Sequence, residues 1–177
     1  MVSALPALPM MVATARPAIA ATAQRIDVIA VCEEGWLYSF PIDRVNPAIG
    51  DAQAVGLSVL VSSFATTALV RAGTRLVALA VDIEGQLRVA HKDDGGVWST
   101  ISVVAGAVLS PCGGVSAAAV STGIAAVAMT SDGQPCWTTS TEGTEWTALM
   151  PVDIYILRRA DHLPEHHPTP ARQPRLN

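Results

Sequence analysis

The sequence predicts an all-β protein built from three consecutive copies of one supersecondary unit. The copies are most similar over residues 17–40, 67–90 and 115–138. Their anchor glycines, Gly35, Gly85 and Gly133, are 50 and 48 residues apart. A period near 50 that is divided into four short strands is typical of a β-propeller blade. We therefore expect about three four-stranded blades, covering about residues 17–66, 67–114 and 115–155.

The second copy shows the four strands most clearly. Residues 67–71 (TALVR) form a short apolar strand, and the near-continuous apolar run 75–81 (RLVALAV) predicts a strand buried on both faces. Residues 86–91 (QLRVAH) alternate polar with apolar, which predicts one exposed face. Residues 97–104 (VWSTISVV) supply the fourth strand, and turns rich in Asp and Gly separate the four.

The composition fits this fold and excludes several classes of function. Half of the residues are hydrophobic but only 5% are aromatic, so small side chains must build a tightly packed core. The net charge of −4 argues against a nucleic-acid binder, which needs a basic face. No apolar run approaches the roughly 20 residues of a membrane span. The first residues lack the basic region of a clear signal peptide, so the sequence leaves open whether the protein is cytoplasmic or secreted.

The ends of the chain and the cysteines give no sign of a metal site. We expect residues 1–16 to be an extension and the proline-rich residues 156–177 to be a disordered tail. The tail contains HLPEH at 162–166, but the H-x-x-E-H zinc motif must be helical, and Pro164 opposes a helix. Three cysteines without metal-ligand spacing are interpreted as buried small hydrophobic residues. We expect no metal and no cofactor.

Three blades are fewer than the four to eight that typically close a propeller. The sequence therefore predicts that further blades complete the ring. They come from a homo-oligomer, such as two copies giving six blades, or from a longer propeller of which this chain is a part, or from degenerate blades that the repeat pattern does not reveal.

The repeat pattern resembles that of a known group of proteins over residues 17–150. An apolar strand leads to x-x-G-x-L, then a charged strand and a glycine turn, with Trp98 and Trp146 thirteen residues after their anchor glycines. This pattern resembles bacterial and fungal propeller lectins, most of all a seven-bladed type related to tectonin-like and fucose-binding lectins. The resemblance implies sugar binding between neighbouring blades, where aromatic rings stack on pyranose rings and Arg or acidic side chains bond the hydroxyls.

The stretch HKDDGGVW resembles a second repeat motif, the Asp-box S/T-x-D-x-G-x-x-W of sialidase-type propellers. His91 takes the Ser/Thr place, followed by Asp93, Gly95 and Trp98, and residues 139–146 (TSTEGTEW) repeat the motif weakly. An Asp can bond the amides of its own turn, and glycine supplies a positive φ. The partial echo one period later favours a hairpin device over a unique site.

The sequence thus predicts a non-catalytic carbohydrate-binding propeller whose partner is a carbohydrate or glycoprotein. The alternatives are a protein-interaction scaffold and a fragment of a sialidase-type glycoside hydrolase. The hydrolase would need a third arginine beside the aligned Arg25 and Arg75, where the third copy has Gly123. Aromatic rings in these repeats can also be filler between blades. The candidate sugar contacts are Trp36, Tyr38, Arg88, His91, Asp93, Trp98, Trp137 and Trp146.

Overall fold

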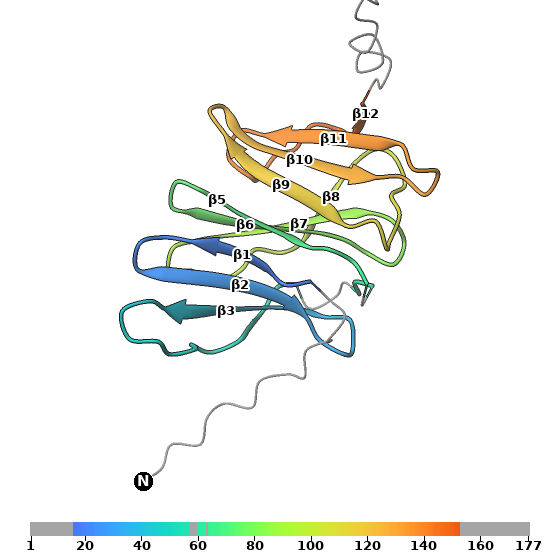
Figure 1. The fold of residues 1–177 in the computed structure, drawn as a ribbon. Coiled ribbons are helices and arrows are strands. Elements are labelled where there is room, and N and C mark those ends of the chain that lie inside the picture. Colours follow the sequence, from blue (N-terminus) through green and yellow to red (C-terminus); the bar gives the residue numbers. More distant parts are fainter. Residues whose placement is uncertain (1–15, 57–59, 63, 153–177) are drawn as a thin grey trace, which may run out of the picture.

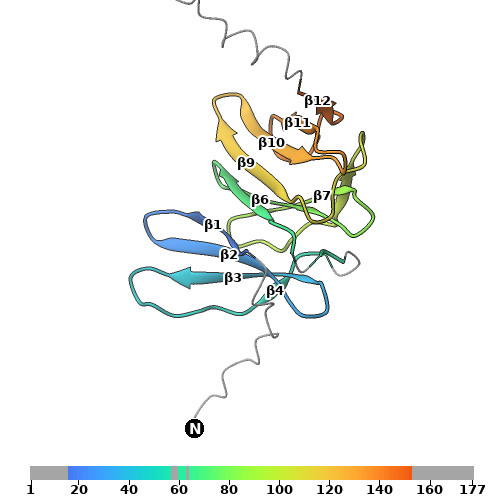
Figure 2. The same cartoon turned by 45° about the vertical axis from the view of Figure 1, so that its right-hand side comes forward.

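The structure, a computed structural model, describes residues 16–56, 60–62 and 64–152. They form three four-stranded antiparallel sheets that lie one against the next in chain order (Figures 1 and 2). This confirms the predicted fold of three propeller blades. Blade 1 contains β1 (Ala18–Ala21), β2 (Arg25–Val31), β3 (Leu37–Asp43) and β4 (Gln53–Ala54). Blade 2 contains β5 (Ala68–Ala72), β6 (Arg75–Val81), β7 (Leu87–Asp93) and β8 (Ser102–Val104). Blade 3 contains β9 (Val115–Val120), β10 (Gly123–Met129), β11 (Pro135–Ser140) and β12 (Met150–Pro151).

The anchor glycines set the same register in every blade. Each has a φ between 79° and 86° and closes the turn between the second and third strands, a conformation that L side chains rarely adopt. Residues at equal distances from the glycine therefore occupy equivalent positions. The residue six before it pairs with the residue four after it: Ile29 with Ser39, Leu79 with Val89, and Val127 with Trp137.

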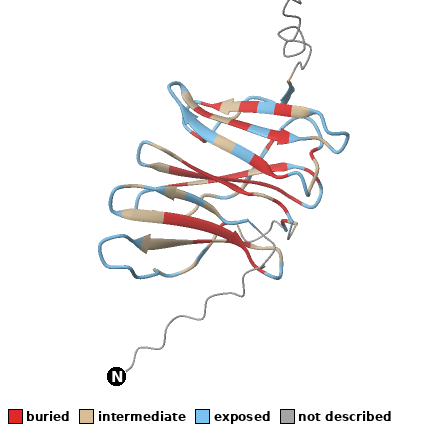
Figure 3. Ribbon diagram, viewed as in Figure 1, coloured by how far each residue is buried: buried red, intermediate tan, exposed pale blue. Residues whose placement is uncertain are grey.

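Two apolar cores lie between the blades, and the middle blade contributes to both. Leu76 and Ala78 join a cluster with blade 1, whereas Val77 and Leu79 join a cluster with blade 3. Alternate residues of one strand therefore face opposite neighbours, as the pleat requires. In Figure 3 the strands of blade 2 are buried along most of their length, as the apolar run in β6 predicts.

Two details of blade 2 differ from the sequence expectation. Residues 86–91 were expected to leave one face exposed, but Ala90 is 2% exposed and the neighbouring Lys92 is 5% exposed. Both face blade 1, because a middle blade has a sheet on each side. The fourth strand is also shorter than predicted. It begins at Ser102, because residues 97–101 run irregularly while Trp98 packs against the core.

Several expectations concern single residues or the ends. Cys32 and Cys136 are buried as expected, but Cys112 is exposed in the linker between blades 2 and 3, so its expected burial is wrong. Residues 1–15 and 153–177, with HLPEH, lie outside the described residues. Within the described ranges, no helix is long and apolar enough to cross a membrane. The same part of the chain shows no group of three His, Cys, Asp or Glu placed to hold a metal ion.

Candidate functional site

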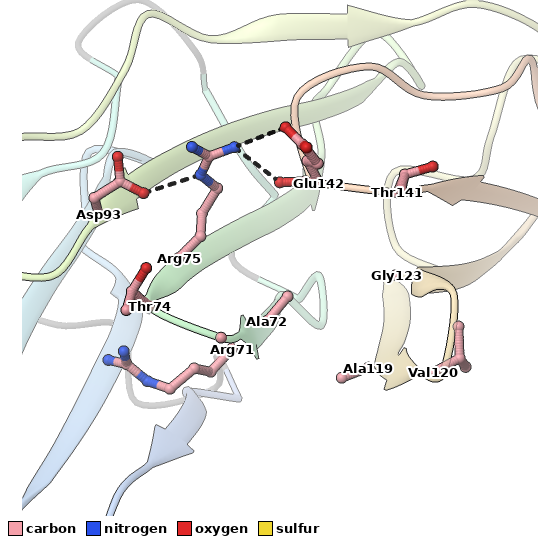
Figure 4. A pocket seen from close by; sticks show the side chains of 11 residues that line it. Arg71, Ala72, Thr74, Arg75, Asp93, Ala119, Val120, Gly123, Thr141 and Glu142 are labelled. Carbon is pink, nitrogen blue, oxygen red and sulfur yellow. Dashed lines mark hydrogen bonds and ion pairs between the residues drawn. The ribbon is translucent and has the colours of Figure 1, made fainter.

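A cavity of about 550 Å³ lies between blades 2 and 3, at the rim formed by their first hairpins. Arg75, at the start of β6, reaches across it between Asp93 of blade 2 and Glu142 of blade 3 (Figure 4). The other lining residues are Arg71, Ala72, Gly73, Thr74, Ala119, Val120, Gly123 and Thr141.

Ion pairs hold the two arginines of this cavity. Arg75 Nε donates to Asp93 Oδ1 at 3.0 Å, and an Arg75 terminal nitrogen donates to the Glu142 carbonyl oxygen at 3.2 Å. Arg71 turns toward blade 1, where it bonds Asp27 at 2.8 Å, and it also bonds Asp94 at 2.6 Å. Burial alone would lower the pKa of Arg71, but the bonds to Asp94 and Asp27 outweigh it and raise that pKa, so the group is permanently charged.

Gly123 lines this cavity at the position that Arg25 and Arg75 fill in the other blades. Its φ is 136°, and a Cβ there would lie 2.2 Å from the Ser140 carbonyl oxygen. The third repeat therefore cannot carry the arginine that a sialidase-type cluster needs. The same glycine leaves Thr141 as part of the cavity wall.

A second cavity of about 410 Å³ adjoins the first, because Thr141 lines both. Trp146 forms part of its wall, and the Trp146 indole N–H donates to the Gly143 carbonyl oxygen at 3.3 Å. Trp146 also packs against the core between blades 2 and 3, which fixes its orientation. The remaining lining is rich in hydroxyl groups: Thr122, Ile124, Thr139, Ser140, Glu145 and Thr147.

A third cavity of about 350 Å³ lies beside Trp98, the equivalent of Trp146 in blade 2. Trp98 packs against the core between blades 1 and 2. Its indole nitrogen is buried and has no hydrogen-bond partner among the described residues. Gln53, Ser99 and Thr100 supply polar groups to this cavity.

The three blades and the cavities at their junctions are the features to compare with known proteins. No family model matches the chain, and no curated protein matches it. Among solved structures, the BP39L lectin from Burkholderia pseudomallei matches with a TM-score of 0.66 and 20% identity over 78% of this chain and 41% of that one. The fold is that of the propeller lectins.

Two structures of a fungal lectin from Aleuria aurantia share this fold. One is described as a six-bladed β-propeller with a novel fucose recognition mode and matches with a TM-score of 0.57. The other, a mercury derivative of a fucose-specific lectin, matches with a TM-score of 0.53. Each shares 16% identity over 76% of this chain and 45% of its own. The chain thus spans less than half the length of these lectins.

Three of the eight candidate residues line a cavity of this propeller: Asp93, Trp98 and Trp146. Arg88 instead bonds Asp82 Oδ2 at 2.6 Å, while Asp82 Oδ1 accepts the amides of the β6–β7 turn. His91 is half-buried, and its backbone exchanges hydrogen bonds with Ser99.

The other three aromatic candidates lie apart from these cavities. Trp36 is half-buried just before β3. Tyr38 pairs with Ala30 on the outer face of blade 1, and Trp137 pairs with Val127 on the outer face of blade 3. Tyr38 and Trp137 therefore lie at opposite ends of the described stack.

The Asp-box stretch forms a hairpin, but the Asp93 carboxylate bonds an arginine side chain and not the amides of its own turn. Gly95 has a φ of 75°, as the motif expects. Asp93 Oδ1 accepts a hydrogen bond from Arg75, and it is the Asp93 carbonyl oxygen that accepts the Gly96 amide. Arg75 was not among the residues predicted to contact a ligand, although it lines the first cavity. Its alignment with Arg25 was the available signal.

Proposed function

We propose that this chain is a carbohydrate-binding, lectin-like propeller module that binds sugar without catalysis at the two adjoining cavities of blades 2 and 3. One observation carries the proposal: Trp146, fixed by its packing and its indole bond, shares a cavity of about 410 Å³ with a carboxylate and several hydroxyl groups. Pockets for small molecules typically combine such an apolar wall with a few polar groups.

This combination suits the chemistry of a sugar. A pyranose ring presents C–H bonds on its faces, which pack on an aromatic ring, and hydroxyl groups at its edge. Thr139, Thr141 and Glu145 are placed to bond such hydroxyls beside Trp146. In the adjoining cavity, Arg75 and Asp93 offer a charged donor and acceptor for a second sugar unit. The matched solved structures are described as lectins, which supports the class of ligand.

The proposal ranks the eight candidates. Asp93 and Trp146 belong to the principal site, and Trp98 belongs to a second, weaker site that would raise the avidity for a multivalent glycan. Four candidates remain predictions, because they line none of the three cavities: Trp36, Tyr38, His91 and Trp137. Arg88 is left out of the proposed site, because it lines none of the three cavities and its guanidinium pairs with Asp82.

The two alternatives have weaker support. In a hydrolase of the sialidase type, a cluster of three arginines would hold the substrate, but Arg25 pairs with Asp27 and lines none of the three cavities described above. The third equivalent position is Gly123. A protein-interaction scaffold would require a partner surface on the rim, and the cavities there favour a small polar ligand.

A glycan array with the full chain tests the proposal, followed by titration of the best glycan. Thr141→Val removes one hydroxyl, and Glu145→Gln replaces a charged acceptor by an amide of the same shape. Both residues are exposed, so the fold should be kept, and each change is expected to weaken binding about tenfold, the value of one hydrogen bond. Thr144→Val is the matched control, because Thr144 is exposed in the same turn but lines neither cavity.

The alternatives make different predictions for the same protein. A blank array with folded protein would overturn the lectin proposal, and specific capture of a protein partner would then favour the scaffold. Turnover of a fluorogenic sialoside would favour the hydrolase. Equal affinity of the Thr141→Val, Glu145→Gln and control variants would move the site away from these cavities.

A further inference from the structure

The outer face of blade 3 carries core-type residues that no other blade of the described residues covers. Val127 and Trp137 pair across β10 and β11 and are 43% and 37% exposed. Their equivalents in blade 2, Leu79 and Val89, pair in the same way and are 0% and 2% exposed. In Figure 3, buried and exposed residues alternate along blade 3. The sequence of this face is therefore that of an interior, although its position is that of a surface.

The opposite end of the stack repeats this situation. The outer face of blade 1 presents Ile19, which is 64% exposed, and the half-buried Phe40 and Ile42. The equivalents of Phe40 and Ile42 in blade 2 are Ala90 and Lys92, both buried against blade 1. Among the described residues, no blade precedes blade 1 and none follows blade 3.

We infer that a second copy of this chain covers both faces, so that blade 3 of each copy packs against blade 1 of the other and two copies close one six-bladed ring. The two faces are different surfaces of the sheet. They therefore form a head-to-tail contact of the kind that already joins consecutive blades within the chain, and such contacts make a ring when the rotation closes.

The junction between blades 1 and 2 shows which positions would meet. Lys92 Nζ donates to Ser39 Oγ at 3.3 Å and to Gln53 Oε1 at 3.2 Å. By register, the position of Lys92 is taken in blade 1 by Ile42. The positions of Ser39 and Gln53 are taken in blade 3 by Trp137 and Met150. A polar set inside the chain thus becomes an apolar set at the two ends, and Ile42 of one copy matches both side chains of the other.

A second polar contact between blades 1 and 2 is also replaced by apolar residues at both ends of the stack. Arg71 of blade 2 bonds the fully buried Asp27 of blade 1. The equivalent of Arg71 in blade 1 is Ala21, and the equivalent of Asp27 in blade 3 is Ala125. Neither end face leaves a charged group without its counterpart. Both faces therefore match each other at the positions where the internal junction is polar.

The geometry of the solved relatives favours closure after two copies. The Aleuria aurantia lectin described as six-bladed matches this chain over 45% of its length. Three blades in the arrangement of such a ring cover half a circle. The closed dimer contains two new junctions, and a stable complex of about 1,200–2,000 Å² would need each to bury only about half of that.

Sedimentation of the full chain tests the inference directly. The expected mass is about twice 18.4 kDa for the wild type. Trp137→Glu and Ile42→Lys each alter both junctions of a dimer, so each variant alone is expected to sediment as a monomer. In an equimolar mixture, one junction joins the new Glu to the new Lys and the other is wild type, so the mixture is expected to regain the dimer.

Controls separate this result from loss of folding. Circular dichroism must show the same strand content in each variant. Ile83→Glu alters an exposed residue of the middle blade and is expected to remain dimeric. A monomeric wild type overturns the inference, as does a Trp137→Glu variant that stays dimeric or a mixture that stays monomeric. The result does not depend on sugar binding, so the glycan array and this experiment can fail independently.

Discussion

The ion pair between Asp27 of blade 1 and Arg71 of blade 2 is buried. Replacing both residues by those at the equivalent positions between blades 2 and 3 is expected to lower the free energy of unfolding far less than replacing one of them. Asp27 is fully buried and bonds Arg71 of blade 2 and Arg25 of its own strand. The equivalent pair between blades 2 and 3 is Val77 with Ala119. The chain itself therefore supplies the apolar version for Asp27→Val and Arg71→Ala.

The magnitudes follow from what each change leaves behind. Arg71→Ala leaves the buried carboxylate with Arg25 alone, whose side chain is one-third exposed, and should cost about 2–3 kcal/mol of unfolding free energy. Asp27→Val leaves Arg71 with the exposed Asp94 and should cost about 2 kcal/mol. The double variant leaves no buried charge unpaired, because Arg25, which also loses Asp27, is one-third exposed and can be hydrated, and it should cost about 1 kcal/mol. The coupling between the two sites is then about 3 kcal/mol.

Urea unfolding of the four proteins measures this coupling. With a slope of about 2 kcal/mol per molar urea, each single variant should lower the midpoint by about 1 M, and the double variant by about half of that. Protein concentration must be equal throughout, because self-association raises apparent stability. Additive costs, with coupling below about 1 kcal/mol, would refute the reasoning that equivalent positions of the three blades are interchangeable in pairs.

Three further outcomes are expected. Gly85→Ala should lower the free energy of unfolding by about 1–3 kcal/mol more than Gly133→Ala in urea unfolding. Both glycines have positive φ, but a Cβ at Gly85 would lie 2.5 Å from a backbone carbonyl oxygen, whereas a Cβ at Gly133 would meet nothing within 4 Å. Burial lowers the pKa of Lys92 in the folded state below its ordinary 10.5, so the unfolded chain binds more protons between the two values and stability rises with pH there. Lys92→Met lacks this term, so its stability relative to the wild type should fall as the pH is raised toward 10.5. Of the three thiols, Cys112 alone is exposed and should react rapidly with a disulfide reagent, and equal rates for all three would contradict the described burial.

The sequence allowed the blades to be predicted because their determinants are local. The apolar run of β6, the anchor glycines and the turn residues act within one hairpin, and together they specify four strands per copy. The burial of Lys92 could not be predicted in this way. It depends on Ser39 and Gln53, which lie 53 and 39 residues away and meet it only across a blade junction.

The candidate site was only partly predictable for the same reason. Asp93 and Trp146 could be predicted because their motifs recur in the repeats. Gly123, which lines the cavity beside them, could be recognised in the sequence only as the absence of an arginine. Its φ of 136° and the backbone oxygen 2.2 Å from the position of a Cβ show that the backbone path of the third repeat has no room for a side chain there. Arg75 of the preceding blade then spans the opening to Glu142. In a repeat protein, functional residues are therefore best sought where one repeat differs from the others, and each such position should be compared with the residues that face it from the neighbouring blade.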